Sequence, residues 1–543
     1  MAGALALVAA SVGNTAFGAA APAARMGGAV ASVELHGDQW VLRRGVLVGT
    51  AAAYGSLSNG TVGGWSTLDI AANLRGANGN ATLAYAAAGR LEAALSCWHI
   101  GTFAKNNDDP KTGEKSPRVA SFIGDSMTWI RGQVASNRSD YWTQVGNSLA
   151  QFDGLVEGYQ QYCSGTPGYT ALTPNQMLYM QMDGDLEDLN SAFMAHRPEA
   201  TAPGNRTFND GLRCSMLAKL SDDKQDMFFA HATWDSFSNM SPRIYKIYHL
   251  PVVRKGTQAV HTVSFSSSPS WLASIDDWYM TNGTSSLVVI ETSHEIQNSQ
   301  LYKKLSPQTV FCWLRVVVAN ALAADGAEWA AIFSAYHSGT YNNEWQVIDL
   351  HKFTPGANPS PGLLTIVEEI PGLIHAEDMT STMVAMGGYW PSFNVPYFPD
   401  IQRAAGYQPS DWTDDPRHCL LKGLQSSVQS TATMEAAIRH NNFKVDKCSH
   451  DDPCTGAISC RADLELPSQM FGGLDGKWSS WTDVMQGGFT AIAELGPTHD
   501  NQKVFCWSSH PMSFDPHHGH PDCFDFVPVK ISPSPDVPVP SLS

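Results

Sequence analysis

Short apolar runs, separated by glycine and polar turns, recur along most of the chain. Their lengths and β-branched content predict strands, and hairpin-length turns join many of them. The predicted strands cover residues 30–35, 39–49, 211–220, 227–234, 243–248, 259–265, 286–292, 346–350 and 363–369. Longer patterns with helical spacing predict helices over residues 81–104, 141–162, 176–182, 310–324 and 329–336. Strands with helices beside them, without regular strand–helix–strand repeats, indicate a layered α+β protein.

One predicted hairpin carries a cysteine and a histidine. If Leu220 pairs with Met227 across the charged turn 221–226, then Thr233 lies opposite Cys214 and His231 lies opposite Met216. Because side chains alternate between faces, these residues would share one face, with the imidazole diagonal to the thiol. A slip of one residue in register would separate them. The same pattern is also typical of a core cysteine beside a core histidine.

The polar segment 198–210, just before this hairpin, suggests a second use for the cysteine. Cleavage of the Arg213–Cys214 bond would leave an α-amine, with a reference pKa of about 7.7–8.0, on the residue that carries the thiol. One residue would then supply both nucleophile and base, as in N-terminal nucleophile hydrolases. The thiol could make the cut itself by attacking the preceding carbonyl.

Several segments resemble the phospholipase B-like (laminin ancestor) family. The maturation-site segment 212–220 with 231–234, and residues 338–349, close to the family signature SGTYNNQW, carry the main resemblance. Residues 290–293 resemble its LETT strand, with Ser293 in place of the second threonine. Further matches in the family's order are 184–189, 363–371, 394–398 and 452–454. The chain departs from the family after Pro416-Arg417 and in the spacing of its cysteine-rich loop.

The resemblance implies a four-layer αββα N-terminal nucleophile hydrolase, matured by autoproteolysis into two fragments that remain associated. It implies Cys214 as the nucleophile, His231 and Asn343 as catalytic residues, and Trp234, Thr233 and Ser293 in the substrate pocket. The amide of Asn343 suits an oxyanion hole, because it can donate a hydrogen bond without titrating. Strand parity leaves open whether Asn342 or Asn343 points inward, and the family pattern favours Asn343.

The resemblance therefore predicts an acyl hydrolase that deacylates glycerophospholipids through a Cys214 thioester. The alternative is a lysosomal lipid-binding or amide-hydrolysing N-terminal nucleophile protein with little phospholipase activity. The predicted parts are a signal peptide at 1–24, an N-terminal fragment at 25–213, and a C-terminal fragment at 214–543.

Charge and targeting signals limit which binding partners and which cellular location we expect. The 34 lysines and arginines against 51 aspartates and glutamates give a net charge of −17, which argues against nucleic acid as a partner. The short apolar start reads as a secretory signal peptide, and no later segment reaches about 18 uninterrupted apolar residues, so no integral membrane segment is expected. Six sequons add to a secreted or lysosomal route: Asn59, Asn80, Asn137, Asn205, Asn239 and Asn282.

No cofactor or metal is expected. The cysteine-rich loop at 446–463 lacks the paired spacing of a zinc site, so a Cys454–Cys460 disulfide is predicted instead. The acidic stretch 183–189 is read as a solvated turn rather than a calcium loop. The histidines at 510, 517, 518 and 520 are read as a solvated loop. A serine-lipase alternative needs a strand with a GDS turn at 122–127 and the pair Asp515 and His518, which lie nearly four hundred residues further along the chain.

Overall fold

The computed structural model describes residues 29–60, 63–107, 116–193, 214–283, 285–511 and 515–541. It is an α+β structure built on two large sheets. The predicted signal peptide, Asn205 and Arg213 lie outside the described residues. Within them, no helix combines the length and apolar character needed to cross a membrane.

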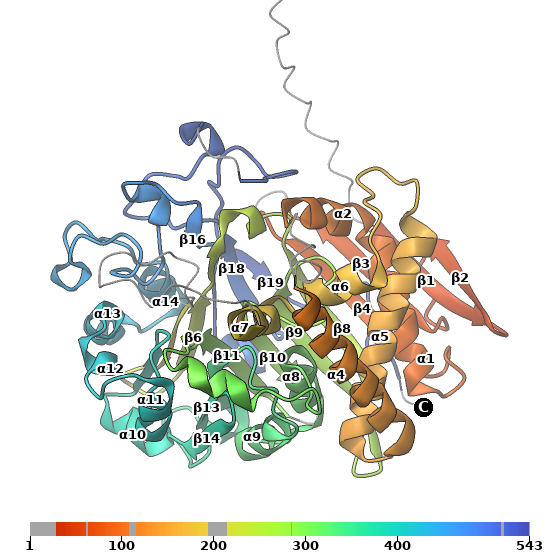
Figure 1. Cartoon of the computed structure of the whole chain (residues 1–543), viewed down its shortest axis with the longest axis horizontal. Coiled ribbons are helices and arrows are strands. Elements are labelled where there is room, and N and C mark those ends of the chain that lie inside the picture. The colour runs from red at the N-terminus through yellow and green to blue at the C-terminus, as the bar shows by residue number, and fades with distance from the viewer. Residues whose placement is uncertain are drawn as a thin grey trace, which may run out of the picture.

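The larger sheet has eleven strands in the order β14-β13-β12-β11-β10-β9-β8-β4-β3-β1-β2. Neighbouring strands are antiparallel except for β4 and β8, whose parallel pairing joins the segment before the predicted cut to the segment after it. Figure 1 shows β1–β4 continuing the surface that β8 and β9 form. The strands are β1 (Ala29–His36), β2 (Gln39–Arg44), β3 (Ala53–Asn59), β4 (Ser66–Ala72), β8 (Ile244–Arg254), β9 (Thr257–Ser267), β10 (Trp278–Asn282), β11 (Leu287–Ser293), β12 (Asn343–Asp349), β13 (Leu364–Ile370) and β14 (Leu373–Asp378).

The smaller sheet has six strands in the order β15-β5-β6-β17-β18-β19. Its central hairpin is the predicted one, and Leu220 pairs with Met227 as the register requires. A short two-stranded ribbon of β7 (Trp234–Ser236) and β16 (Phe471–Gly473) continues beyond β6. The six strands are β15 (Tyr389–Ser392), β5 (Ser215–Leu220), β6 (Met227–Ala232), β17 (Asp475–Ser480), β18 (Ala491–Leu495) and β19 (Val529–Ile531).

Two hydrophobic cores follow from the alternation of side chains along the strands. On β11, Val289 belongs to the core under the helices, and Ile290 belongs to the core shared with the small sheet. Met216 and Phe229 enter that second core from β5 and β6. The two sheets therefore pack face to face.

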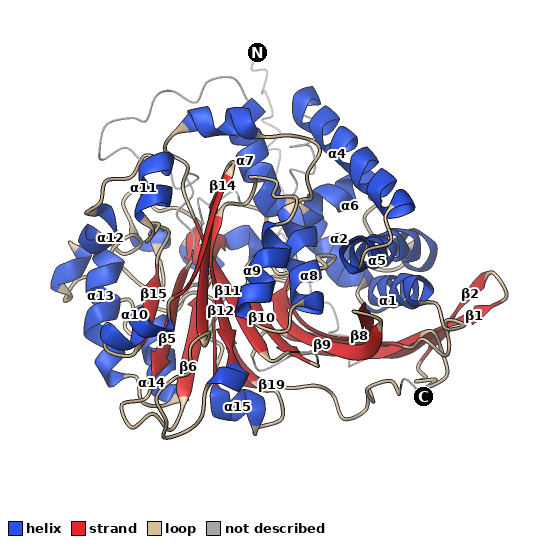
Figure 2. Cartoon of the chain, turned by 90° about the horizontal axis from the view of Figure 1, so that it is seen from below, coloured by secondary structure: helices blue, strands red, loops and turns tan. Residues whose placement is uncertain are grey.

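Helices cover both outer faces (Figure 2). On the large sheet lie α1 (Ala81–Leu95), α2 (Cys97–Asn106), α4 (Pro117–Ser136), α5 (Asp140–Cys163), α6 (Pro174–Gln181), α7 (Asp183–Phe193), α8 (Cys312–Leu322) and α9 (Gly326–Ser334). Around the small sheet lie α10 (Thr380–Ala385), α11 (Pro399–Ala405), α12 (Asp411–Asp414), α13 (Pro416–Leu424), α14 (Thr431–Ile438) and α15 (Trp481–Met485). Local sequence explains their starts: Asn80 caps α1 and Ser139 caps α5, each accepting a backbone N–H with its side chain.

Three predictions about local structure were wrong. The helix predicted over 81–104 breaks at Ser96 into α1 and α2. The acidic stretch 183–189 is the start of α7, not a solvated turn, because Asp185 and Asp188 are buried and hydrogen-bonded. Residues 122–127 lie inside α4 rather than in a strand and turn, which removes the geometry of the serine-lipase alternative.

Four disulfides join Cys97 to Cys163, Cys419 to Cys448, Cys454 to Cys460, and Cys506 to Cys523. The expected Cys454–Cys460 pair is thus present, and the remaining cysteines, Cys214 and Cys312, are buried outside any disulfide.

The sequons described by the structure differ in accessibility. Asn80 and Asn282 are exposed, and Asn59 and Asn137 are half-buried. Asn239 is buried, and its amide donates a hydrogen bond to Asp235, so it offers no accessible acceptor in the folded chain.

Candidate active site

Cys214 immediately precedes β5 and is only 3 % exposed. It extends the β5–β6 register, in which Met216 lies opposite His231. The φ of Cys214 is +73°, in the left-handed region that side chains with a Cβ rarely adopt. Such strained backbone concentrates at functional positions, where the surrounding structure holds it in place.

The thiol lies in a cluster drawn from both sheets. The sulfur of Cys214, a ring nitrogen of His231 and a carboxylate oxygen of Glu291 all lie within 4.8 Å of one another. His231 belongs to β6 of the small sheet and Glu291 to β11 of the large sheet. Sequence reasoning brought Cys214 and His231 together through the hairpin register. It gave Glu291 no role, because pairing within one hairpin says nothing about a facing sheet.

His231 is fully buried. Burial is the main reason that its pKa lies well below the usual value, and the positive charge of Lys477 lowers it further. Its Nδ1 lies 3.5 Å from Thr233 Oγ1, and Nε2 makes no hydrogen bond of good geometry within the described residues. A pKa this low makes the imidazole a weak base for the thiol, so its part would be to orient the thiol by a hydrogen bond.

A buried network of charges fixes Thr233, and through it His231. Lys477 donates to Thr233 Oγ1 and lies 2.7 Å from Asp475 and 3.4 Å from Asp276. Arg243 completes the network by pairing with Asp475 at 3.1 Å and with Asp276. Both cations and both carboxylates are compensated in the interior, so the network can hold a fixed geometry.

Glu291 and Asp277 form an acidic pair around the hydroxyl of Tyr341. The Tyr341 hydroxyl lies 2.6 Å from Asp277 Oδ2 and 2.9 Å from Glu291 Oε1. Burial, followed by the charge of Glu291, raises the pKa of Asp277 well above its ordinary value. Two carboxyl groups that share the Tyr341 hydroxyl do not both ionise readily, which favours one shared proton between Asp277 and Glu291.

Arg417 holds the backbone of Cys214. Its Nη1 donates to the Cys214 carbonyl oxygen at 2.9 Å and to Asn394 Oδ1 at 2.8 Å. Asn394 in turn donates through Nδ2 to the carbonyl oxygen of Ser293 at 2.8 Å. Arg417 and Asn394 therefore connect Cys214 to the end of β11. Sequence reasoning noted Pro416-Arg417 only as the start of a departure from the family.

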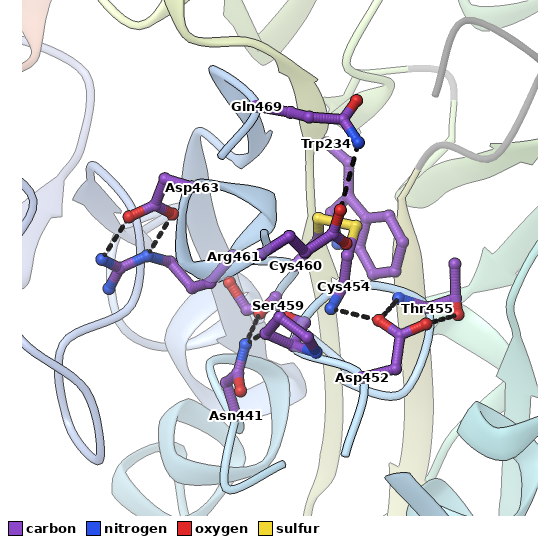
Figure 3. Close-up of a disulfide and its surroundings, with 12 residues drawn as sticks. Trp234, Asn441, Asp452, Cys454, Thr455, Ser459, Cys460, Arg461, Asp463 and Gln469 are labelled. Carbon is purple, nitrogen blue, oxygen red and sulfur yellow. Dashed lines mark hydrogen bonds and ion pairs between the residues drawn. A yellow bond between two sulfur atoms is a disulfide. The ribbon is translucent and has the colours of Figure 1, made fainter. Parts of the chain in front are cut away.

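Trp234 links this arginine to the cysteine-rich loop. The Arg417 guanidinium carbon lies 4.6 Å from the Trp234 ring centroid, a distance typical of a cation–π contact. The indole nitrogen donates to the Ile458 carbonyl at 3.1 Å. Figure 3 shows the ring beside the Cys454–Cys460 disulfide, with which it shares a small buried cluster.

Ser293 and Asn343 are directly paired across β11 and β12, so their side chains lie on one face. Both are buried, and neither the Ser293 hydroxyl nor the Asn343 amide has a hydrogen-bond partner among the described residues. The neighbouring Asn342 differs, because its amide donates to Asp188 at 2.9 Å and to the Gly339 carbonyl at 3.0 Å. Of the two asparagines, only Asn343 has an amide available to a substrate.

Within the described residues, two groups of side chains have the geometry for a metal ion. One is the Cys214, His231 and Glu291 cluster, and the other is His294, Glu344 and Glu368. The histidines at 510, 517, 518 and 520 form no such group. The acidic residues Asp185 and Asp188 are also committed elsewhere, accepting hydrogen bonds from Cys312 N and Asn342 N.

The fold and site define an α+β protein with a buried thiol, imidazole and carboxylate where two facing sheets meet. Comparison with known proteins assigns the family. A family model described as phospholipase B matches residues 53–531. Phospholipase B-like protein B of Dictyostelium discoideum is 33 % identical to this chain, over 85 % of this chain and 82 % of the relative. Phospholipase B-like protein C of the same organism is 32 % identical, over 86 % of this chain and 85 % of the relative. The chain belongs to the phospholipase B family.

Proposed function

We propose that the protein is an N-terminal nucleophile hydrolase that removes acyl chains from glycerophospholipids, with Cys214 as the nucleophile. The observation that carries the proposal is the Cys214, His231 and Glu291 cluster within 4.8 Å. Helices on the outer faces of two face-to-face sheets agree with the αββα arrangement of that class. Family membership supports the phospholipid as substrate.

Maturation would be a self-cleavage. The Cys214 thiol attacks the carbonyl carbon of Arg213, the bond from that carbon to the Cys214 nitrogen breaks, and a thioester forms while the nitrogen becomes an α-amine. Water then hydrolyses the thioester, giving an Arg213 carboxylate and a regenerated thiol. The positive φ of Cys214 and the hydrogen bond from Arg417 to its carbonyl oxygen support this step, since both fix the backbone of Cys214, the residue that would attack.

Turnover would reuse the same thiol. Its sulfur attacks the acyl carbonyl of the lipid, and the α-amine, with a reference pKa of about 7.7–8.0, accepts the thiol proton and passes it to the departing alcohol. Water then hydrolyses the acyl thioester. The Asn343 amide would donate to the developing oxyanion, a contribution of about 3 kcal/mol for one such donor. Trp234, Thr233 and Ser293 would line the acyl pocket.

A secreted or lysosomal location completes the proposal. The four disulfides support passage through an oxidising compartment. The predicted signal peptide and the exposed sequons Asn80 and Asn282 agree with that route.

Replacing the nucleophile tests both steps. We expect Cys214→Ala to remain a single chain by intact mass, while the native protein gives two chains, the second beginning at Cys214. We expect Cys214→Ser to cleave more slowly, because a hydroxyl is the weaker nucleophile.

Activity is measured on glycerophospholipids and on N-acyl amides with the matured protein. Two-fragment processing in Cys214→Ala would refute the self-cleavage. Lipid binding with no release of fatty acid from either substrate class would favour the lipid-binding alternative.

A further inference from the structure

A second buried group of chemically active side chains lies between the sheets, outside the nucleophile cluster. It consists of His294, which directly follows β11, Glu344 on β12, and Glu368 on β13. One nitrogen of the histidine and one oxygen from each carboxylate all lie within 4.8 Å of one another. Glu344 and Glu368 are directly paired across their strands, and both are fully buried.

The two carboxylates have no basic side chain paired with them among the described residues. Other buried glutamates do have one: Glu92 lies 2.7 Å from Lys246, and Glu369, the neighbour of Glu368, lies 2.9 Å from Arg315. A buried carboxylate without a compensating charge is strongly unfavourable, and two side by side are more so. The interior therefore requires either a cation or a shared proton at this point.

Burial and the neighbouring Glu344 raise the pKa of Glu368 well above its usual value, and two backbone hydrogen bonds act in the opposite direction, toward the charged form. Its two oxygens accept the backbone N–H groups of Tyr397 and Phe398, the second at 3.1 Å. Such bonds stabilise a carboxylate over a carboxylic acid. Glu344 accepts the indole N–H of Trp390 at 2.9 Å on one oxygen only.

Several atoms around this point remain available as ligands. Within the described residues, neither the second oxygen of Glu344 nor either ring nitrogen of His294 makes a hydrogen bond of good geometry. Gln346, two residues further along the same face of β12, is fully buried, and its amide makes no hydrogen bond of good geometry within the described residues. Polar atoms buried without partners are unusual and call for a binding partner.

We propose that His294, Glu344 and Glu368 bind a divalent cation, and that Zn²⁺ is the ion best suited to them. One imidazole nitrogen and two carboxylate oxygens match the ligands that zinc accepts, and Gln346 or a water molecule can complete a tetrahedron. The ion would cancel the excess negative charge and tie β11, β12 and β13 together next to Ser293 and Asn343. The site is independent of the proposed hydrolase activity.

Metal content and stability of the full-length mature protein test the site. After dialysis against metal-free buffer, we expect about one Zn²⁺ per chain by mass spectrometry of the elements, since a closed site exchanges its ion slowly. We expect Glu344→Gln, which keeps the shape and the Trp390 hydrogen bond, to lose that zinc. Chelation should lower the melting temperature of the native protein but not that of Glu344→Gln.

Two control variants locate the ion. His351→Asn removes an exposed histidine beside Asp349, outside the three-residue group, and it should keep the zinc. Cys214→Ala should also keep it. Zinc lost from Cys214→Ala but kept in Glu344→Gln would place the ion in the nucleophile cluster and overturn the proposal. A shared proton in place of an ion would also overturn the proposal. In that case the native protein would contain no metal, and added Zn²⁺ or Mn²⁺ would leave its melting temperature unchanged. Glu344→Gln would then melt at a higher temperature than the native protein at neutral pH.

Discussion

Arg417 shows how much a single side chain contributes to this site. It contacts the Cys214 carbonyl, Asn394 and the Trp234 ring, and it is fully buried. These partners come from different parts of the sequence. The planar guanidinium reaches all of them in one fixed geometry, which a lysine ammonium cannot reproduce.

We therefore expect Arg417→Lys to slow self-cleavage by about 10-fold, the loss expected from one hydrogen bond to a charged group. The measurement is the fraction of cleaved chain against time in freshly produced protein. Arg315→Lys is the matched control, because Arg315 is equally buried but pairs with Glu369 instead of with the Cys214 backbone. Equal cleavage rates in the two variants, at similar melting temperatures, would contradict a specific role for Arg417.

For the side chains of the site, the sequence could predict only the relative positions of those on the β5–β6 hairpin. The register that places His231 opposite Met216 follows from a charged turn and strand alternation, and it is confirmed. Glu291 and Arg417 reach the site from another sheet and from α13, so no local pattern could reveal them. The hydrogen bond from Asn342 to Asp188, which distinguishes it from Asn343, likewise joins residues far apart in the sequence.

At the scale of elements, the acidic helix α7 explains a wrong prediction. Aspartates are rarely buried, so a run of them is usually read as solvated. Here Asp185 accepts the backbone N–H of Cys312 at 3.1 Å, at the start of α8. Burial raises the pKa of Asp185 to about 6 despite such hydrogen bonds. The partners lie more than a hundred residues away, beyond the reach of any local pattern.

The cysteine-rich loop holds Trp234 by contacts between segments that are far apart in the sequence. We expect a Cys454→Ala, Cys460→Ala double variant to mature normally but to hydrolyse lipid more slowly. Its loss of stability should be about 2 kcal/mol, the value that loop closure gives for so short a disulfide loop. The slower hydrolysis is expected because the Trp234 ring packs on this disulfide and its indole N–H bonds to the loop. Initial rates on matured protein provide the measurement.

The control for that variant is the removal of the Cys506–Cys523 disulfide, which lies outside the Trp234 cluster. If both double variants lower the rate equally, the loop has no specific role in placing Trp234.

At the scale of the whole molecule, the predicted cut falls between segments that share one sheet. The parallel β4–β8 pairing runs from Ser66 with Ile244 to Ala71 with His249. The C-terminal tail also returns to the N-terminal segment, where the Tyr54 hydroxyl donates to the Pro538 carbonyl at 2.8 Å. Extensive backbone pairing and packing would hold two fragments together without a covalent link.

We accordingly expect the matured protein to run as one species on a native sizing column and as two chains on a denaturing gel, even without reducing agent. Cys97–Cys163 lies entirely before the cut, and the other three disulfides lie entirely after it. Fragments that stay joined on the non-reducing gel, or that separate on the native column, would contradict this assembly.

The β4–β8 seam also has a consequence for how the chain reaches its native state. On either side of the seam, most neighbouring strands follow one another along the chain, so their pairing closes short loops at small entropic cost. At the seam, β4 and β8 must find one register although more than a hundred residues separate them along the chain. Contacts between distant segments are the slow ones in folding, so this strand pair divides the large sheet into two quickly formed halves and one late junction.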